Sequence, residues 1–177
     1  MDTAKIFPTQ IAFAVAQRIV DELRPACDRI EIAGSLRRGN NMVHDIDILL
    51  LPKEAGEGFS LESSTLLEGL IGQLVARGSL TPVRGKEKIK CFVATKTGIP
   101  VDVYVAKPET WATLLLIRTG SKEHNIKLAQ RAKELGMKLR ASGDGIEHVN
   151  GDLLRVNAEE EIFALLNLPY VRPEERS

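Results

Sequence analysis

The sequence predicts an α+β fold in which a mixed β-sheet flanked by helices is followed by a small, mostly helical unit. Two observations support this prediction. Up to residue 106, short extended segments alternate with stretches of helical periodicity. After Lys107-Pro108 the periodicity becomes helical. We therefore expect two units in the chain of 177 residues, covering residues 1–107 and 108–177.

The first unit should begin with a helix from Pro8 to Arg24. Its apolar residues recur at every fourth position, which gives a helix one apolar face. These residues are Ile11, Val15, Ile19 and Leu23. Pro25 ends the pattern. The other expected elements are a helix at residues 61–77 and strands at residues 29–33, 45–51, 89–95 and 100–106.

The second unit should contain three helices, at residues 109–118, 121–135 and 159–166. Ser121 is a favourable N-cap for the middle helix, and Gly136 is typical of the position just after a helix ends. Residues 143–157 are rich in turn-forming residues and contain only short extended pieces. Helices therefore dominate the prediction for this unit.

The composition is that of a globular protein without a membrane-spanning segment. Hydrophobic residues make up 44% of the chain and charged residues 27%. No apolar run reaches the roughly 18–20 residues that a membrane span requires, and the first residues lack the features of a secretory signal. Two cysteines, Cys27 and Cys91, are too few for a disulfide framework or a zinc site. We therefore expect a reducing, cytoplasmic location.

The net charge of zero does not exclude a nucleic-acid partner, because the charges are unevenly distributed. The 24 Lys and Arg residues balance 24 Asp and Glu residues over the whole chain. The segment from Arg84 to Lys96, however, contains five basic residues and one acidic residue, and the segment from Arg118 to Arg140 contains seven basic residues and two acidic residues. Locally positive segments can contact phosphates while the total charge stays neutral.

Three aspartates are the candidate centre of chemistry. Asp45 and Asp47 lie two residues apart in an expected strand, so that both carboxylates share one face. Asp102 lies in the middle of an apolar strand, where an unpaired charge is costly. If the two strands are neighbours, the three carboxylates meet, and a pair of Mg²⁺ ions suits such a group. The alternative is that each acid simply faces water.

The segment Gly34-Ser35-Leu36-Arg37-Arg38-Gly39 is a candidate phosphate-binding turn. It follows the first expected strand, and a Gly-Ser turn into a helix offers backbone N–H groups and a hydroxyl to an anion. The two arginines add fork-shaped donors for phosphate oxygens. A loop with solvated arginines is the alternative. The phosphate-binding interpretation is favoured because Asp45 and Asp47 follow shortly after the segment.

With these motifs the sequence resembles the polymerase-beta-like nucleotidyltransferases, and more closely the family X DNA polymerases. The motifs of the first unit are Gly34-Ser35, Arg38, Asp45-Ile46-Asp47 and Asp102. In the second unit, residues 119–125, 132–139 and 160–173 resemble the thumb of that family. The resemblance implies a nucleotidyltransferase palm at residues 1–107 and a thumb at residues 108–177. It implies a minimal form that lacks the family's lyase, fingers and phosphoesterase domains.

The resemblance also implies a role for each matching residue. Asp45, Asp47 and Asp102 would be the catalytic and metal-binding residues for two Mg²⁺ ions, which Mn²⁺ could replace. The expected nucleotide-binding residues are Gly34, Ser35, Arg38, His44, Gly120, Ser121 and Asn125. The expected DNA-binding residues are Arg84, Lys86, Lys88, Lys90, Lys122 and Lys127. His44 would act through its backbone N–H, and an ordinary surface histidine is the alternative.

Some positions depart from the family pattern. Most members have Tyr-Phe before the residues that match Thr119-Gly120, where this chain has Ile117-Arg118. We therefore expect weaker discrimination against ribonucleotides. Ala129 stands where an arginine often contacts the template, so a weaker grip on the template is expected as well.

Together these features predict a template-directed DNA polymerase that adds nucleotides to a primer 3′-hydroxyl in gap filling or DNA repair. The expected partners are primed or gapped DNA and dNTPs, with rNTPs as a second option, and a monomer without a membrane partner is expected. Two alternatives stay open. One is a nucleotidyltransferase of the same fold that modifies a small molecule or a protein, which has no reason to keep the thumb around Asn125. The other is a non-catalytic DNA-end-binding subunit, which has no use for three converging acids.

Overall fold

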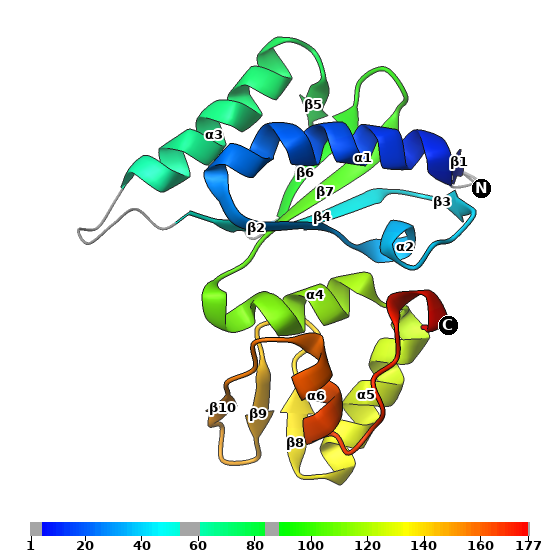
Figure 1. Cartoon of the computed structure of the whole chain (residues 1–177), viewed down its shortest axis with the longest axis vertical. Coiled ribbons are helices and arrows are strands. Elements are labelled where there is room, and N and C mark those ends of the chain that lie inside the picture. Colours follow the sequence, from blue (N-terminus) through cyan, green and yellow to red (C-terminus); the bar gives the residue numbers. More distant parts are fainter. Residues whose placement is uncertain (1–4, 54–60, 84–88, 177) are drawn as a thin grey trace.

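In the computed structural model, which describes residues 5–53, 61–83 and 89–176, a five-stranded sheet organises the first part of the chain (Figure 1). Its strand order is β2-β4-β7-β6-β5. The central pair, β4 and β7, is parallel and the other neighbours are antiparallel, so the sheet is mixed, as predicted. The strands are β2 (Cys27–Ile32), β4 (Ile46–Pro52), β5 (Leu80–Pro82), β6 (Ile89–Ala94) and β7 (Ile99–Val105).

Helices cover both faces of this sheet (Figure 1). Helices α1 (Thr9–Leu23) and α3 (Leu61–Ala76) lie on one face, and α4 (Trp111–Thr119) lies on the other. Alternate residues of β4 enter different cores, because Ile48 packs with residues of α1 and α3 whereas Leu49 packs with Trp111. Asp47 is two residues before Leu49 and therefore faces the α4 side of the sheet.

Short elements connect the sheet to the helices. The turn-rich segment after β2 forms a single-turn helix, α2 (Gly34–Arg37), and β1 (Phe7–Pro8) pairs with β3 (Met42–Val43). The buried face of α1 is centred on Ala12 and Ala16. Ile11, which periodicity placed in the core, is 48% exposed. Its expected helix is present, but the apolar face is rotated toward the alanines, which let α1 approach the sheet closely.

The second part of the chain combines helices with a three-stranded antiparallel sheet of order β10-β9-β8. Its elements are α4, α5 (Lys122–Glu134), β8 (Met137–Leu139), β9 (Ile146–His148), β10 (Leu153–Leu154) and α6 (Glu159–Leu165). The sequence predicted only short extended pieces at residues 143–157, and β8 was not predicted. Leu128, Ile146 and Phe163 are among the residues that form a separate core.

Helix α4 joins the two parts. Trp111 and Leu115 pack against the palm sheet, while Ala112 and Leu116 belong to the core of the second part. We call the residues before α4 the palm, and α4 together with the residues after it the thumb. Within the described ranges, no helix combines the length and apolar character that crossing a membrane would require.

Candidate active site

The parallel pairing of β4 and β7 brings two of the three predicted acids together. Asp47 is the direct register partner of Asp102. Ile46 and Ile48 on β4, and Val101 and Val103 on β7, are fully buried on the opposite face of the sheet. This burial turns both aspartates toward the thumb side. The sequence predicted Asp45 inside this strand, but Asp45 lies immediately before β4.

Burial and repulsion make Asp45 and Asp47 poorly suited to carry charge without a cation. Burial first, and then the charges of Asp45 and Asp102, raise the pKa of Asp47 to about 7. Burial and the charge of Asp102 also raise the pKa of Asp45, although His44 and Arg38 oppose this shift. Carboxylates under mutual repulsion present the hard oxygen donors that Mg²⁺ prefers.

The acids do not form a closed metal cage. Among the residues that the structure describes, no three His, Cys, Asp or Glu side chains are arranged to enclose an ion. Mg²⁺ is commonly bound by one or two carboxylates together with waters and substrate phosphates, so an open arrangement fits this ion. The donor set thus suits ions whose coordination is completed by water and substrate oxygens.

Tyr104 lies beside Asp47 and Asp102. Its hydroxyl donates to Asp102 Oδ2 at 3.4 Å, and its proximity partly offsets the rise in the pKa of Asp47. Burial and the two acidic charges raise the pKa of Tyr104, so the hydroxyl keeps its proton. The guanidinium of Arg118 lies over the Tyr104 ring, 4.5 Å from its centroid. Nothing in the sequence pattern predicted a role for this tyrosine.

Helix α2 approaches the acids as closely as a glycine allows. Gly34 has φ +61°, and a Cβ added there would lie 2.0 Å from Asp47 Oδ2. The backbone N–H of Ala33 donates to the Asp47 carbonyl oxygen at 2.8 Å, which fixes this approach. The requirement for glycine in the Gly34-Ser35 motif therefore has two causes, a left-handed backbone and contact with a carboxylate.

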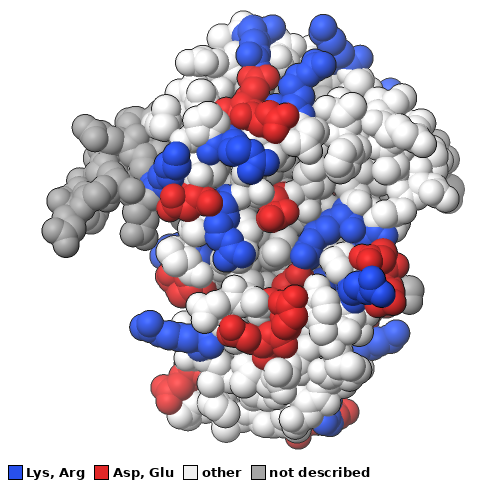
Figure 2. Space-filling model, viewed as in Figure 1, with Lys and Arg blue, Asp and Glu red and all other residues white. Residues whose placement is uncertain are grey.

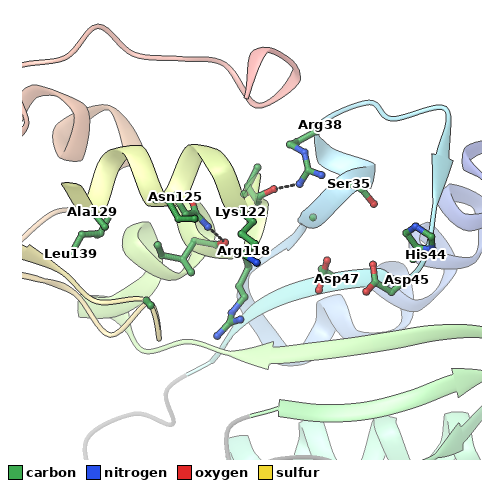
Figure 3. Close-up of a pocket in the computed structure, with 16 residues that line it drawn as sticks. Ser35, Arg38, His44, Asp45, Asp47, Arg118, Lys122, Asn125, Ala129 and Leu139 are labelled. Atoms are coloured by element: carbon green, nitrogen blue, oxygen red, sulfur yellow. Dashed lines mark hydrogen bonds between the residues drawn. The ribbon is translucent and has the colours of Figure 1, made fainter. Parts of the chain in front are cut away.

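A cavity of about 560 Å³ lies between the acids and the thumb (Figure 3). Its palm side includes Asp45 and Asp47, and the predicted nucleotide-binding residues that line it are Gly34, Ser35, Arg38, His44, Gly120 and Asn125. Ser121 is not among the lining residues. Its hydroxyl instead accepts a hydrogen bond from the His124 backbone N–H at 3.2 Å and caps α5. Asp102 also lies outside the lining, next to Tyr104.

The thumb side of the cavity carries several apolar side chains beside Arg118 and Lys122. Its lining residues from this side include Ile117, Ile126, Ala129, Leu139 and Ala141. Asn125 donates through Nδ2 to the Ile117 carbonyl oxygen at 2.8 Å (Figure 3). Its Oδ1 is buried and has no hydrogen-bond partner among the described residues. The roles of Ile126 and Leu139 were not predicted, because these residues come from separate elements and meet only in the folded chain.

Two palm side chains reach the edge of the cavity. The Arg38 guanidinium donates to the Thr119 carbonyl oxygen (Figure 3). His44 contacts the Lys5 carbonyl oxygen through Nδ1 at 3.2 Å. The Lys5 backbone therefore holds the imidazole of His44. The predicted phosphate-binding group of His44 is its own backbone N–H, which this contact does not involve.

The predicted DNA-binding residues are scattered. Arg84, Lys86 and Lys88 lie outside the described residues. Lys90 forms an ion pair with Glu68 at 2.5 Å. Lys122 lines the cavity, and Lys127 lines a second cavity on the thumb. Figure 2 shows basic and acidic side chains mixed on the face that it presents.

Among known proteins, one family model matches the thumb, and two relatives match most of the chain. The family model described as the DNA polymerase beta thumb matches residues 114–177. The DNA polymerase/3′-5′ exonuclease PolX of Bacillus subtilis is 31% identical over 173 residues, which cover 96% of this chain and 28% of that protein. DNA polymerase lambda of Rattus norvegicus is 28% identical over 159 residues, which cover 81% of this chain and 28% of the relative. The chain thus spans less than a third of the length of these relatives.

Proposed function

Because the chain belongs to the family X DNA polymerases, we propose that it adds nucleotides to a primer 3′-hydroxyl under the direction of a template. The observation that carries the proposal is the register of β4 and β7. It sets Asp102 opposite Asp47, beside a cavity that Ser35 and Arg38 line. Acids on one side and phosphate-binding donors on the other are what nucleotidyl transfer requires.

In the proposed reaction, the 3′-oxygen attacks the α-phosphorus of a nucleoside triphosphate. A new P–O bond forms as the bond to the pyrophosphate oxygen breaks, and pyrophosphate leaves. Two Mg²⁺ ions, or Mn²⁺ in their place, would be held by Asp45 and Asp47, with Asp102 on one of them, and would neutralise the charge of the transition state. Asp102 is our candidate acceptor for the proton of the 3′-hydroxyl.

The chain's own residues would position the nucleotide. The Ser35 hydroxyl and the Arg38 guanidinium line the cavity on the palm side and would donate to the triphosphate oxygens. To do so, Arg38 would exchange its hydrogen bond with the Thr119 carbonyl oxygen for one with phosphate. The sugar and base would then extend toward the thumb wall, where Asn125 Oδ1 is an acceptor without a partner among the described residues.

We further propose primed or gapped DNA as the partner and gap filling or repair as the role. The segments of local positive charge supply the phosphate contacts, while the neutral total keeps the affinity modest. Binding of this kind weakens steeply as salt concentration rises, because each phosphate contact releases counterions.

Primer extension on a gapped duplex with Mg²⁺ or Mn²⁺ tests the proposal, with Asp102→Ala as the control. Extension that the substitution abolishes supports it. Transfer of a nucleotidyl group to a small molecule or a protein without extension would indicate a different transferase of the same fold. Tight binding of DNA ends without any turnover would indicate a binding subunit.

A further inference from the structure

A cluster of buried charges joins the palm to the thumb. Glu159, the first residue of α6, accepts hydrogen bonds from two arginines. Arg37 of α2 donates to both of its carboxylate oxygens, at 2.6 and 3.0 Å, and Arg176 donates to Oε1 at 2.7 Å. The side chains of Glu159 and Arg176 are 5% and 0% exposed, and that of Arg37 is 21% exposed. A carboxylate shared by two guanidiniums in the interior is a specific and strongly directional contact.

The thumb side of this cluster is fixed in place. Arg176 also donates through Nε to the Val171 carbonyl oxygen at 2.9 Å, and its guanidinium lies 5.6 Å from the ring centroids of both Phe163 and Tyr170. Burial alone would raise the pKa of Glu159, but the hydrogen bonds from Arg37 and Arg176 outweigh it and hold that pKa below its ordinary value. Glu159 is therefore an ionised, oriented acceptor, and Arg37 is the palm group that docks on it.

Arg37 and its neighbour Arg38 hold the same thumb residue from two sides. Arg37 Nη1 donates to Thr119 Oγ1 at 2.7 Å, while Arg38 donates to the Thr119 carbonyl oxygen. Thr119 is fully buried at the end of α4. It directly precedes Gly120 and Ser121, where the chain enters α5, the helix that carries Asn125. The position of the thumb wall thus depends on two adjacent arginines of α2.

These two arginines have different tasks if the proposed function holds. Arg38 faces the cavity and must release Thr119 when it binds a triphosphate. Arg37 is committed to Glu159 and Thr119, which are both buried. The thumb therefore keeps one attachment to α2 at the moment when the other is lost.

We propose that Arg37 is a positioning residue that, through Glu159 and Thr119, holds the thumb wall against the phosphate-binding residues of α2 while nucleotide enters. This inference rests on the proposed function. It concerns the binding of nucleotide and not the chemical step, so loss of the contact should appear in KM for dNTP and hardly in kcat.

The decisive variant is Glu159→Gln, which keeps the size of the side chain and removes its charge. Its matched control is Glu160→Gln, the same change on an exposed neighbour in the same helical turn. Glu159→Gln should raise KM for dNTP about tenfold, the size expected for one charge-assisted pair, with kcat nearly unchanged. Glu160→Gln should behave as wild type. A fall in kcat at unchanged KM, or no change beyond a lower melting temperature, would overturn the inference.

A second readout does not require polymerase activity. In hydrogen exchange of the full chain, Glu159→Gln should speed exchange at residues 119–125 and leave the exchange rates of α1 unchanged. Arg37→Lys should have the same effect, with a smaller loss of stability than Glu159→Gln. Faster exchange without detectable extension in any variant, wild type included, would contradict the proposed function but support the attachment. Unchanged exchange at residues 119–125 in both variants would refute the attachment itself.

Discussion

Gly34→Ala should move the Asp47 carboxylate and thereby remove most of the activity. An added Cβ would lie 2.0 Å from Asp47 Oδ2 and 3.0 Å from its Cγ, whereas real Cβ atoms essentially never come closer than 3.0 Å to another heavy atom. The carboxylate or α2 must therefore shift by about 1 Å. A displacement of about 1 Å at a reacting centre can cost about 10²-fold in rate.

The same substitution also carries a backbone cost that must be separated from the clash. Gly34 has φ +61°, and an alanine in this region costs about 1–2 kcal/mol. Gly39→Ala is the matched control, because Gly39 has φ +72° and no other described residue comes within 4 Å of an added Cβ. Both variants should lose about 1–2 kcal/mol of unfolding free energy from the backbone in denaturant titrations, and Gly34→Ala should lose more because of the clash with Asp47.

Only Gly34→Ala should lose about 10²-fold in kcat for primer extension, together with affinity for Mn²⁺ in calorimetry. Comparing the two variants isolates the contact between α2 and Asp47. Equal activity and equal Mn²⁺ affinity in the two variants would refute the argument that the position of Asp47 governs the reaction.

Three further predictions concern the thumb. Burial and nearby cations lower the pKa of His124 to about 4, so at this residue the unfolded chain takes up a proton first. The unfolding free energy of the wild type, measured relative to that of His124→Gln, should therefore fall by about 1.4 kcal/mol per pH unit from pH 6.5 toward pH 4; denaturant titrations of both proteins check this difference, because the opposite contribution of Asp47, whose pKa is raised to about 7, is the same in both. Ile117→Tyr should raise the dNTP/rNTP incorporation ratio about tenfold or more, and an unchanged ratio would refute a role for this wall. Gly143→Ala would place a Cβ 2.5 Å from Leu114 Cδ1 and should cost about 2–3 kcal/mol more than Gly151→Ala, which has a similar positive φ without a described neighbour within 4 Å.

The sequence was most informative where one residue type alternated with another. Buried Ile and Val on one face of two strands left Asp47 and Asp102 on the other, and the structure makes these two residues register partners. The parallel pairing itself was not predictable, because α3, β5 and β6 intervene between the two strands. Asp45 lies just outside its strand because β4 starts only at Ile46.

Other parts of the structure correspond to no periodic pattern in the sequence. Strand β8 has three residues and β1 has two, which is too short for an alternation to stand out. In the cluster around Glu159, the bond between Arg37 and Glu159 joins residues 122 positions apart. Nothing local distinguishes a buried Arg176 from the exposed arginines of the chain, because charged residues are buried only when a distant partner is present.

The most direct test of the central claim is a template-exchange experiment. Gapped duplexes that differ only in the single templating base are each supplied with all four dNTPs and Mg²⁺, and the first nucleotide added is identified. We predict that the complementary nucleotide is added on each template and that Asp102→Ala abolishes every addition. Addition of the same nucleotide on all four templates, or addition that persists in Asp102→Ala, would contradict template-directed transfer at the three aspartates.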